Sequence, residues 1–191
     1  MTFQQELSSW AFPTSVTTSP ALEVGNKAPS TSELSFPSSD GKPTVITFLR
    51  HCGCPFAEKT FLSLRDLASK DPSKNYIAVS HSDSPATKNW LSSVGGEGKV
   101  RVIVDDKREL YGKWGLGVSS TWHVLNPWSL YAVYTLGKTE NIWNKPTESG
   151  TRWQTSGSFA VGKDGTVKWA EVPKAADQVP DFGDATRALG A

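Results

Sequence analysis

The feature that most constrains the fold of this chain is a strand pattern followed directly by a helix pattern. The two are joined by a short segment with two cysteines and a proline. Residues 44–49 (TVITFL) form a β-branched and aromatic run of strand length. Residues 50–55 (RHCGCP) follow, and apolar side chains then recur at the spacing of one helix face, at Ala57, Phe61, Leu64 and Ala68. A strand that leads at once into a helix is typical of an α/β domain.

Strand and helix patterns continue to alternate along the chain. Further strands are predicted over residues 76–79 and 100–104, with helices over 86–94 and 108–114. This alternation predicts parallel strands joined by right-handed crossovers. Towards the C-terminus two short strands flank the turn sequence Gly-Lys-Asp-Gly, which predicts a β-hairpin over residues 158–170, and a last helix is expected over 181–189. We therefore predict a central mixed β-sheet flanked by helices.

The composition limits the classes of protein to which the chain can belong. A length of 191 residues suits one domain, with residues 1–23, rich in Ser, Thr and Pro, as an irregular lead-in. The 20 basic residues are balanced by 19 acidic ones, so we expect no nucleic-acid partner. The absence of an apolar run of membrane-spanning length predicts no membrane association, and the absence of a secretory signal pattern predicts a cytoplasmic location. No metal-binding spacing and no cofactor motif are found, so neither is expected.

Cys54 is the main candidate for chemistry. Proline is favoured as the first residue of a helix, so Pro55 is expected to place Cys54 at the N-cap. There the sulfur would lie beside free backbone N–H groups and the positive end of the helix dipole, and Arg50 and His51 could add positive charge. All of these favour a nucleophilic thiolate. The alternative is a small buried side chain that merely caps the helix.

Cys52 has two possible roles that the sequence leaves open. It could resolve an oxidised Cys54 through a strained Cys-Gly-Cys disulfide, or it could pack beside the strand and take no part in chemistry. His81 is a further candidate, because it follows the second strand and the carboxyl ends of strands are where ligands gather in α/β sheets. A hydrogen-bonded loop histidine is the competing interpretation of His81.

Tryptophan is unusually frequent, with eight in the chain, and five of them lie between residues 114 and 153. Residues 115–153, called here the Trp-rich segment, are longer than a minimal fold of this kind requires. One interpretation is an aromatic-walled site beside the cysteines that takes a flat or apolar molecule. The aromatic side chains could instead build a small core of their own or a homodimer interface. The candidate substrate-binding residues are Trp114, Trp122, Trp128 and Trp153.

Three motifs resemble those of a known group of proteins. Residues 24–29 (VGNKAP) look like the Gly-x-x-Ala-Pro start of peroxiredoxin and thioredoxin-like proteins. Residues 48–56 (FLRHCGCPF) resemble the active-site strand and helix start of the AhpC/TSA (peroxiredoxin-like) branch of the thioredoxin-like superfamily, and residues 157–165 (GSFAVGKDG) are similar to its C-terminal hairpin. The resemblance implies a thioredoxin-like fold and an antioxidant thiol oxidoreductase with Cys54 as nucleophile. It also places Arg152 near the position where peroxiredoxin-like proteins keep an arginine.

The chain also departs from these families. A thioredoxin-type Cys-x-x-Cys would need cysteine where Ala57 stands. The peroxiredoxin pattern Pro-x-x-x-Thr-x-x-Cys, aligned on Cys54, would need proline and threonine where Thr47 and His51 stand. The leading hypothesis is reduction of a peroxide by Cys54, with Cys52 or an external thiol as the resolving group. The alternatives are a thioredoxin-fold protein that binds or tailors an apolar organic molecule through the Trp-rich segment, and a Cys-Gly-Cys protein-disulfide exchanger.

Overall fold

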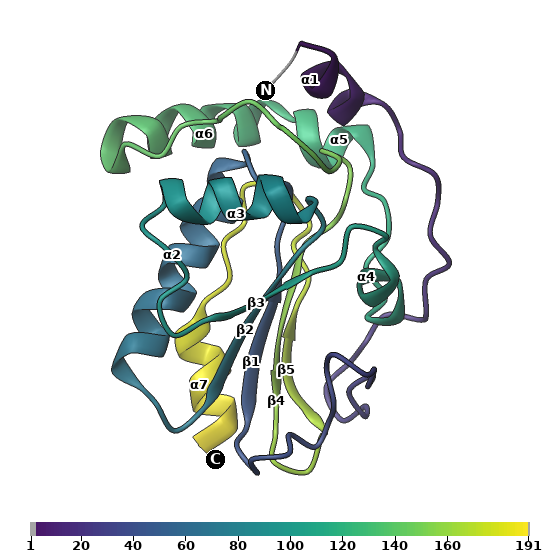
Figure 1. The fold of residues 1–191 in the computed structure, drawn as a ribbon, viewed down its shortest axis with the longest axis vertical. Helices are drawn as coiled ribbons and strands as arrows, with labels where there is room; N and C mark the ends of the chain where they lie inside the picture. The colour runs from purple at the N-terminus through teal and green to yellow at the C-terminus, as the bar shows by residue number, and fades with distance from the viewer. Residues whose placement is uncertain (1–2, 191) are drawn as a thin grey trace.

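The computed structural model describes residues 3–190 and has a five-stranded mixed sheet at its centre, in the order β3-β2-β1-β4-β5 (Figure 1). β1 (Thr44–Phe48), β2 (Asn75–Ser80) and β3 (Arg101–Val104) are parallel. β4 (Gly157–Val161) pairs antiparallel with β1, and β5 (Val167–Glu171) pairs antiparallel with β4. The predicted alternation, the hairpin and the mixed sheet are confirmed, and the fold is thioredoxin-like.

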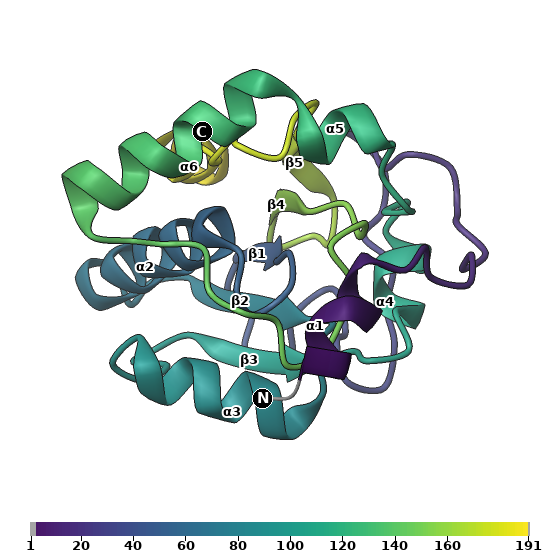
Figure 2. The same cartoon turned by 90° about the horizontal axis from the view of Figure 1, so that it is seen from above.

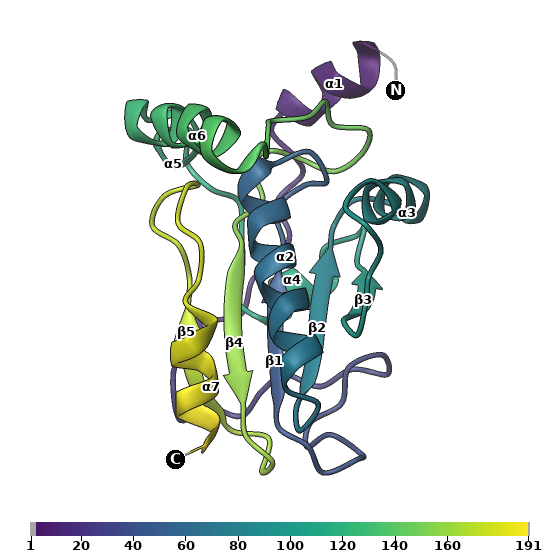
Figure 3. The same ribbon diagram turned by 90° about the vertical axis from the view of Figure 1, so that its left-hand side faces the viewer.

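Helices cover one face of the sheet. α2 (Pro55–Lys70), α3 (Ser84–Ser93) and α7 (Phe182–Gly190) pack there, as Figure 3 shows for α2 and α7. Because side chains alternate between the faces of a strand, Val45 belongs to this layer while its neighbours Ile46 and Phe48 do not. The result is an apolar layer that fixes α2, and with it Cys54, against β1.

The other face is covered by α4 (Glu109–Lys113) and by the lead-in to β1. Trp114 lies at the centre of this layer and is only 1% exposed. Its ring packs against Phe48 and Phe159, with centroid distances of 5.2 and 4.9 Å, and against Phe36 at 5.8 Å. This tryptophan is thus part of the core beneath the sheet.

Three further helices gather at the end of the molecule where β1 and β2 finish. They are α1 (Phe3–Trp10), α5 (Thr121–Leu125) and α6 (Pro127–Glu140), and Figure 2 looks onto this end. Both α5 and α6 begin at a capping residue: Ser120 Oγ accepts from His123 N, and Asn126 Oδ1 accepts from Ser129 N. The Trp-rich segment therefore forms two capped helices over the carboxyl end of the sheet.

The start of the chain is more regular than the sequence indicated. We expected an irregular lead-in with little more than an opening turn, but residues Phe3–Trp10 form α1. The prolines that suggested irregularity begin at Pro13, beyond the end of this helix. No helix among residues 3–190 is long and apolar enough to cross a membrane.

Candidate active site

Cys54 is the N-cap residue of α2, as predicted, and Pro55 is the first residue of that helix. The backbone of Cys54 is extended (φ −74°, ψ 125°), and its sulfur makes no capping hydrogen bond. Residues 49–54, called here the cysteine loop, turn tightly before the helix, because the amides of Gly53 and Cys54 both donate to His51 O, at 2.9 and 3.0 Å. Since Pro55 has no N–H, the first free amide of the helix belongs to Phe56.

Cys54 lines a pocket of about 200 Å³, called here the Cys54 pocket. The cysteine loop and the start of α2 form its floor, and α5 and α6 form a wall of aliphatic side chains, among them Leu130 and Val133. The remaining lining includes Trp10, Asn144, Arg152 and Ala176. The Trp-rich segment thus does face the cysteine, through aliphatic residues of α5 and α6 and through the polar side chains of Ser129, Asn144 and Arg152, but through none of its tryptophans.

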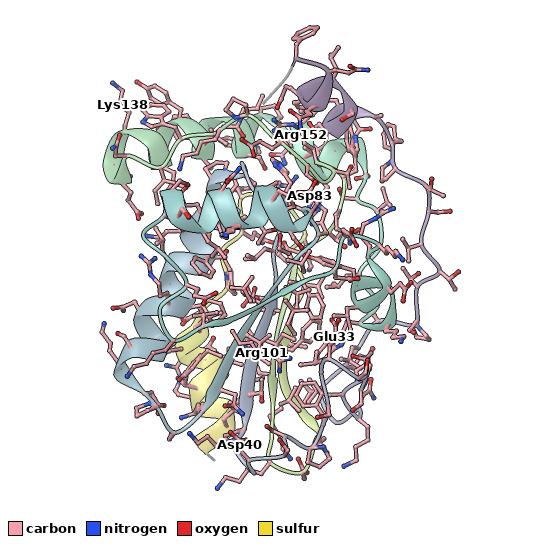
Figure 4. All side chains as sticks on the ribbon, viewed as in Figure 1. Glu33, Asp40, Asp83, Arg101, Lys138 and Arg152 are labelled. Atoms are coloured by element: carbon pink, nitrogen blue, oxygen red, sulfur yellow. The ribbon has the colours of Figure 1, made fainter. Side chains whose placement is uncertain are left out.

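Two arginines lie together beside this pocket. Arg50 is 5% exposed, and its Nη2 donates to Arg152 O at 2.6 Å. Arg152 is also 5% exposed, and its guanidinium bonds Glu6 and Ser9 of α1 (Figure 4, where Arg152 is labelled close to α1). Only one carboxylate, that of Glu6, pairs with these two guanidinium groups among residues 3–190. The pocket therefore carries an excess of positive charge beside the sulfur.

His51 completes the polar side of the pocket. It is fully buried, and its Nδ1 lies 2.9 Å from Thr147 Oγ1. Burial holds the pKa of His51 well below its ordinary value, and the charges of Arg152 and Arg50 lower the pKa further. His51 is consequently a neutral imidazole at neutral pH, and the positive charge of the pocket comes from the arginines alone.

Cys52 lies in different surroundings from Cys54. It lines a second pocket of about 330 Å³, called here the Cys52 pocket, whose other lining residues come from α3 and from residues 145–148. Its sulfur lies 3.5 Å from Ser80 Oγ, and its amide donates to Ser82 Oγ at 3.1 Å. Burial raises the pKa of the Cys52 thiol. Both cysteines are free thiols.

Comparison with known proteins assigns the chain to a family. The family model described as AhpC/TSA antioxidant enzyme matches residues 63–174, which is more than half of the 191 residues. The chain belongs to the AhpC/TSA antioxidant enzyme family. The matched stretch starts after Cys54 and contains β2 to β5 but not β1, so membership does not by itself define the chemistry of the cysteines.

Solved structures with the same fold include several peroxiredoxin-like proteins. A peroxiredoxin-like protein from Aquifex aeolicus has a TM-score of 0.59 and 18% identity, over 90% of this chain and 88% of that one. AhpC from Mycobacterium tuberculosis has a TM-score of 0.52 and 16% identity, over 90% of this chain and 98% of that one. Thiol peroxidase from Chromobacterium violaceum has a TM-score of 0.53 and 14% identity, over 90% and 88%. No curated protein sequence matches the chain significantly.

In this AhpC/TSA protein, His81 is not among the residues that line the Cys54 pocket. Its Nε2 lies 3.0 Å from Thr151 O and 3.3 Å from Thr151 N, and its ring meets Tyr111 edge-on with centroids 5.4 Å apart. Burial lowers the pKa of His81 to about 4. His81, which directly follows β2, therefore holds the backbone of Thr151 next to Arg152. These contacts are structural.

None of the four tryptophans predicted to bind substrate lines the Cys54 pocket. Trp114 belongs to the core, while Trp122 and Trp128 are 73% and 77% exposed. Trp153 is buried: its ring stacks on Phe12 at 4.3 Å, and its Nε1 donates to Trp10 O at 2.9 Å. The Trp-rich segment does not build a tryptophan core of its own either, since Trp143 is also 42% exposed.

Sequence reasoning missed several residues of the Cys54 pocket. Trp10 lies in the segment predicted to be irregular, as does Glu6, which bonds the pocket residue Arg152. Leu130 and Val133 lie in a segment singled out only for its aromatic residues. The apolar residues within 127–140 are the sequence signal that could have pointed to Leu130 and Val133. Among residues 3–190 no cluster of three or more His, Cys, Asp or Glu side chains could hold a metal ion.

Proposed function

We propose that this protein is a thiol peroxidase in which Cys54 reduces an organic hydroperoxide. The observation that carries the proposal is the joint presence of a helix-capping cysteine and two buried arginines in one pocket with aliphatic walls. Helix N-termini and guanidinium groups both favour negative charge on a nearby sulfur. An aliphatic wall suits the organic part of a hydroperoxide.

The proposed reaction begins with attack of the Cys54 thiolate on the hydroxyl oxygen of the hydroperoxide. The O–O bond breaks as the S–O bond forms, so the sulfur becomes a sulfenic acid and the other oxygen leaves as an alkoxide. The alkoxide takes from water the proton that the thiol had given up, and departs as an alcohol. The sulfur has lost two electrons and the peroxide has gained them.

The arginines are proposed to stabilise the charge that moves during this step. Negative charge passes from the sulfur to the leaving oxygen, and a fixed guanidinium can interact with both. Arg152 and Arg50 have this role in the proposal. Neutral His51 is assigned a different one: through Thr147 it holds the cysteine loop against residues 145–147.

An external thiol is proposed to restore Cys54. It condenses with the sulfenic acid, releasing water and forming a mixed disulfide, which a second thiol then reduces. Cys52 is a poor candidate for this step because it lines a separate pocket, and its buried thiol has a raised pKa. The same separation speaks against a Cys-Gly-Cys disulfide exchanger.

The test is peroxide consumption in the presence of a dithiol reductant. Cumene hydroperoxide and hydrogen peroxide are each supplied to the wild type and to the Cys54→Ser and Cys52→Ser variants. The proposal expects turnover by the wild type and by Cys52→Ser, and none by Cys54→Ser. Turnover that persists in Cys54→Ser would contradict it.

Binding of an apolar molecule without cysteine chemistry is the second candidate. It is favoured by the aliphatic wall from α5 and α6, which lies beside Cys54 whether or not the sulfur reacts. A double variant, Cys52→Ser with Cys54→Ser, separates the two candidates. Unchanged ligand binding by this variant, together with a wild type that consumes no peroxide, would favour the binding protein.

A further inference from the structure

Arg152 stands on an irregular stretch of chain between α6 and β4, and the contacts that fix its side chain come largely from α1. Its Nη2 lies 2.5 Å from Glu6 Oε1, and its Nε donates to Ser9 Oγ at 3.2 Å. The backbone is held as well, because Arg152 N donates to Ser9 O at 3.0 Å. The guanidinium carbon also lies 4.6 Å from the centre of the Trp10 ring.

Glu6 also bonds Thr147, through its other carboxylate oxygen. Thr147 N donates to Glu6 Oε2 at 2.7 Å, and the Thr147 hydroxyl bonds the ring of His51. One side chain of α1 is thus joined to Arg152 directly and to His51 through Thr147. Burial alone would raise the pKa of Glu6, but the Thr147 amide and the Arg152 charge lower it below its ordinary value. The carboxylate is therefore charged at neutral pH.

α1 is not held in place mainly by apolar burial. Ser9 is its one buried residue, while Phe3 is 78% and Leu7 55% exposed. Its polar bonds reach across the chain to Thr147 and Arg152, which are 141 and 146 residues from Glu6 in sequence. A helix that served only as covering for the core would bury an apolar face. The polar contacts of α1 instead go to Arg152, which lines the Cys54 pocket, and to Thr147, which bonds the pocket residue His51.

We propose that Glu6 is a positioning residue, which holds the Arg152 guanidinium beside the Cys54 pocket and thereby sets the rate at which Cys54 reacts with peroxide. The inference rests on the proposed peroxidase function. Arginine side chains are long and lose much rotamer freedom when fixed, so a guanidinium without its carboxylate partner spends less time in one geometry. α1 is accordingly a functional part of the site.

A double-mutant cycle tests whether Glu6 acts through Arg152. The variants are Glu6→Ala, Arg152→Met and the combination of the two, and the measured quantity is the second-order rate constant for reaction of Cys54 with cumene hydroperoxide. Glu6→Ala is expected to lower this rate constant about tenfold, the size of coupling typical of contacting charged residues. Arg152→Met is expected to lower it about a hundredfold. The combined variant should match Arg152→Met alone.

Two controls separate positioning from a general loss of structure. Ser8→Ala changes a neighbouring residue of α1 whose hydroxyl bonds only within the helix, to Gln5 O, and should leave the rate constant unchanged. The alkylation rate of Cys54 by neutral iodoacetamide, measured at a pH high enough for the thiol to be ionised in every variant, reports whether the pocket has opened. If Arg152→Met does not fold, Arg152→Lys takes its place, because lysine lacks the planar fork that reaches Glu6 and Ser9 together.

The measured rate constants distinguish a failure of the Glu6 inference from a failure of the proposed peroxidase function. A wild type whose Cys54 does not react with peroxide overturns both. A reactive wild type with an unaffected Glu6→Ala overturns the inference alone. The same holds if Glu6→Ala still lowers the rate tenfold in the Arg152→Met background, since the two residues would then act independently. Loss of the Glu6 effect in that background supports the inference.

Discussion

Cys52 and Cys54 are separated by one residue, yet they line different pockets. Gly53 between them is held by the amide of Lys145, which donates to Gly53 O at 2.9 Å. A Cβ atom at position 53 would lie 2.7 Å from Lys145 O, so only glycine permits this close approach. Gly53 thus holds the loop in an arrangement in which each cysteine lines its own pocket.

Cys52→Ser is therefore expected to keep the reactivity of Cys54 towards peroxide within about twofold of the wild type. The serine hydroxyl can still bond Ser80, so the loop should keep its position. Stopped-flow measurement of peroxide reduction in a single turnover checks this prediction. A large loss of rate, or a Cys52–Cys54 disulfide found by mass spectrometry as the main oxidised product, would show that Cys52 takes part.

Val133→Phe should distinguish large from small peroxides. Val133 belongs to the aliphatic wall, and a phenyl ring there takes up space that the organic group of cumene hydroperoxide needs. We expect the rate constant with cumene hydroperoxide to fall about tenfold and that with hydrogen peroxide to fall much less. Val172→Phe makes the same change at a residue that is 46% exposed and outside the pocket, and should alter neither rate. Equal losses with both peroxides would place the substrate elsewhere.

Burial of His81 predicts a loss of stability in acid. The unfolded chain protonates this histidine below about pH 6.5, whereas the folded protein does so only near a pKa of about 4. Between these values the unfolded state binds more protons, so the free energy of unfolding falls as the pH falls. The contribution of His81 over this range is about 3 kcal/mol.

The variant His81→Gln tests this contribution. The glutamine amide can replace the bond to Thr151 but does not titrate. The free energy of unfolding of the wild type and of His81→Gln is measured in urea between about pH 4 and pH 6.5. Its slope against pH should be smaller for His81→Gln, by the equivalent of about one bound proton. Parallel pH profiles would mean that His81 is not buried in its neutral form.

The tryptophans should differ sharply in their importance for stability. Trp114→Ala removes a core side chain and is expected to cost about 3–5 kcal/mol. Trp128→Ala, at a position 77% exposed, should stay within about 0.5 kcal/mol of the wild type. Urea unfolding measures both. Trp122→Ala and Trp128→Ala should also leave the rate constant for reaction with peroxide unchanged. A lower rate constant in either variant would mean that the tryptophan contributes to substrate binding.

The parts of the fold and site that the sequence predicts well depend on neighbouring residues. Pro55, followed by the apolar spacing of a helix face, places Cys54 at the helix start, because the first position of a helix tolerates the missing N–H of proline. The alternation of strands and helices similarly predicts the parallel half of the sheet. Both inferences rest on rules that act within a few residues, and both are confirmed by the structure.

The parts that sequence reasoning missed depend on residues far apart in the chain. No local rule connects Glu6 with Arg152, and the exposed Phe3 and Leu7 of α1 give no sign of a helix that docks. Helix α6 has apolar residues all around it, so its pattern does not say which of them turn towards Cys54. A cytoplasmic location and a homodimer remain predictions.

In the proposed reaction, Cys54 is the residue that peroxide oxidises. This is tested by exposing the fully reduced protein to one equivalent of cumene hydroperoxide in the presence of a sulfenate-trapping diketone, followed by peptide mass spectrometry. We expect the adduct on Cys54, with Cys52 recovered as the free thiol. An unmodified Cys54, or an adduct confined to Cys52, would mean that Cys54 is not the residue that reduces the peroxide.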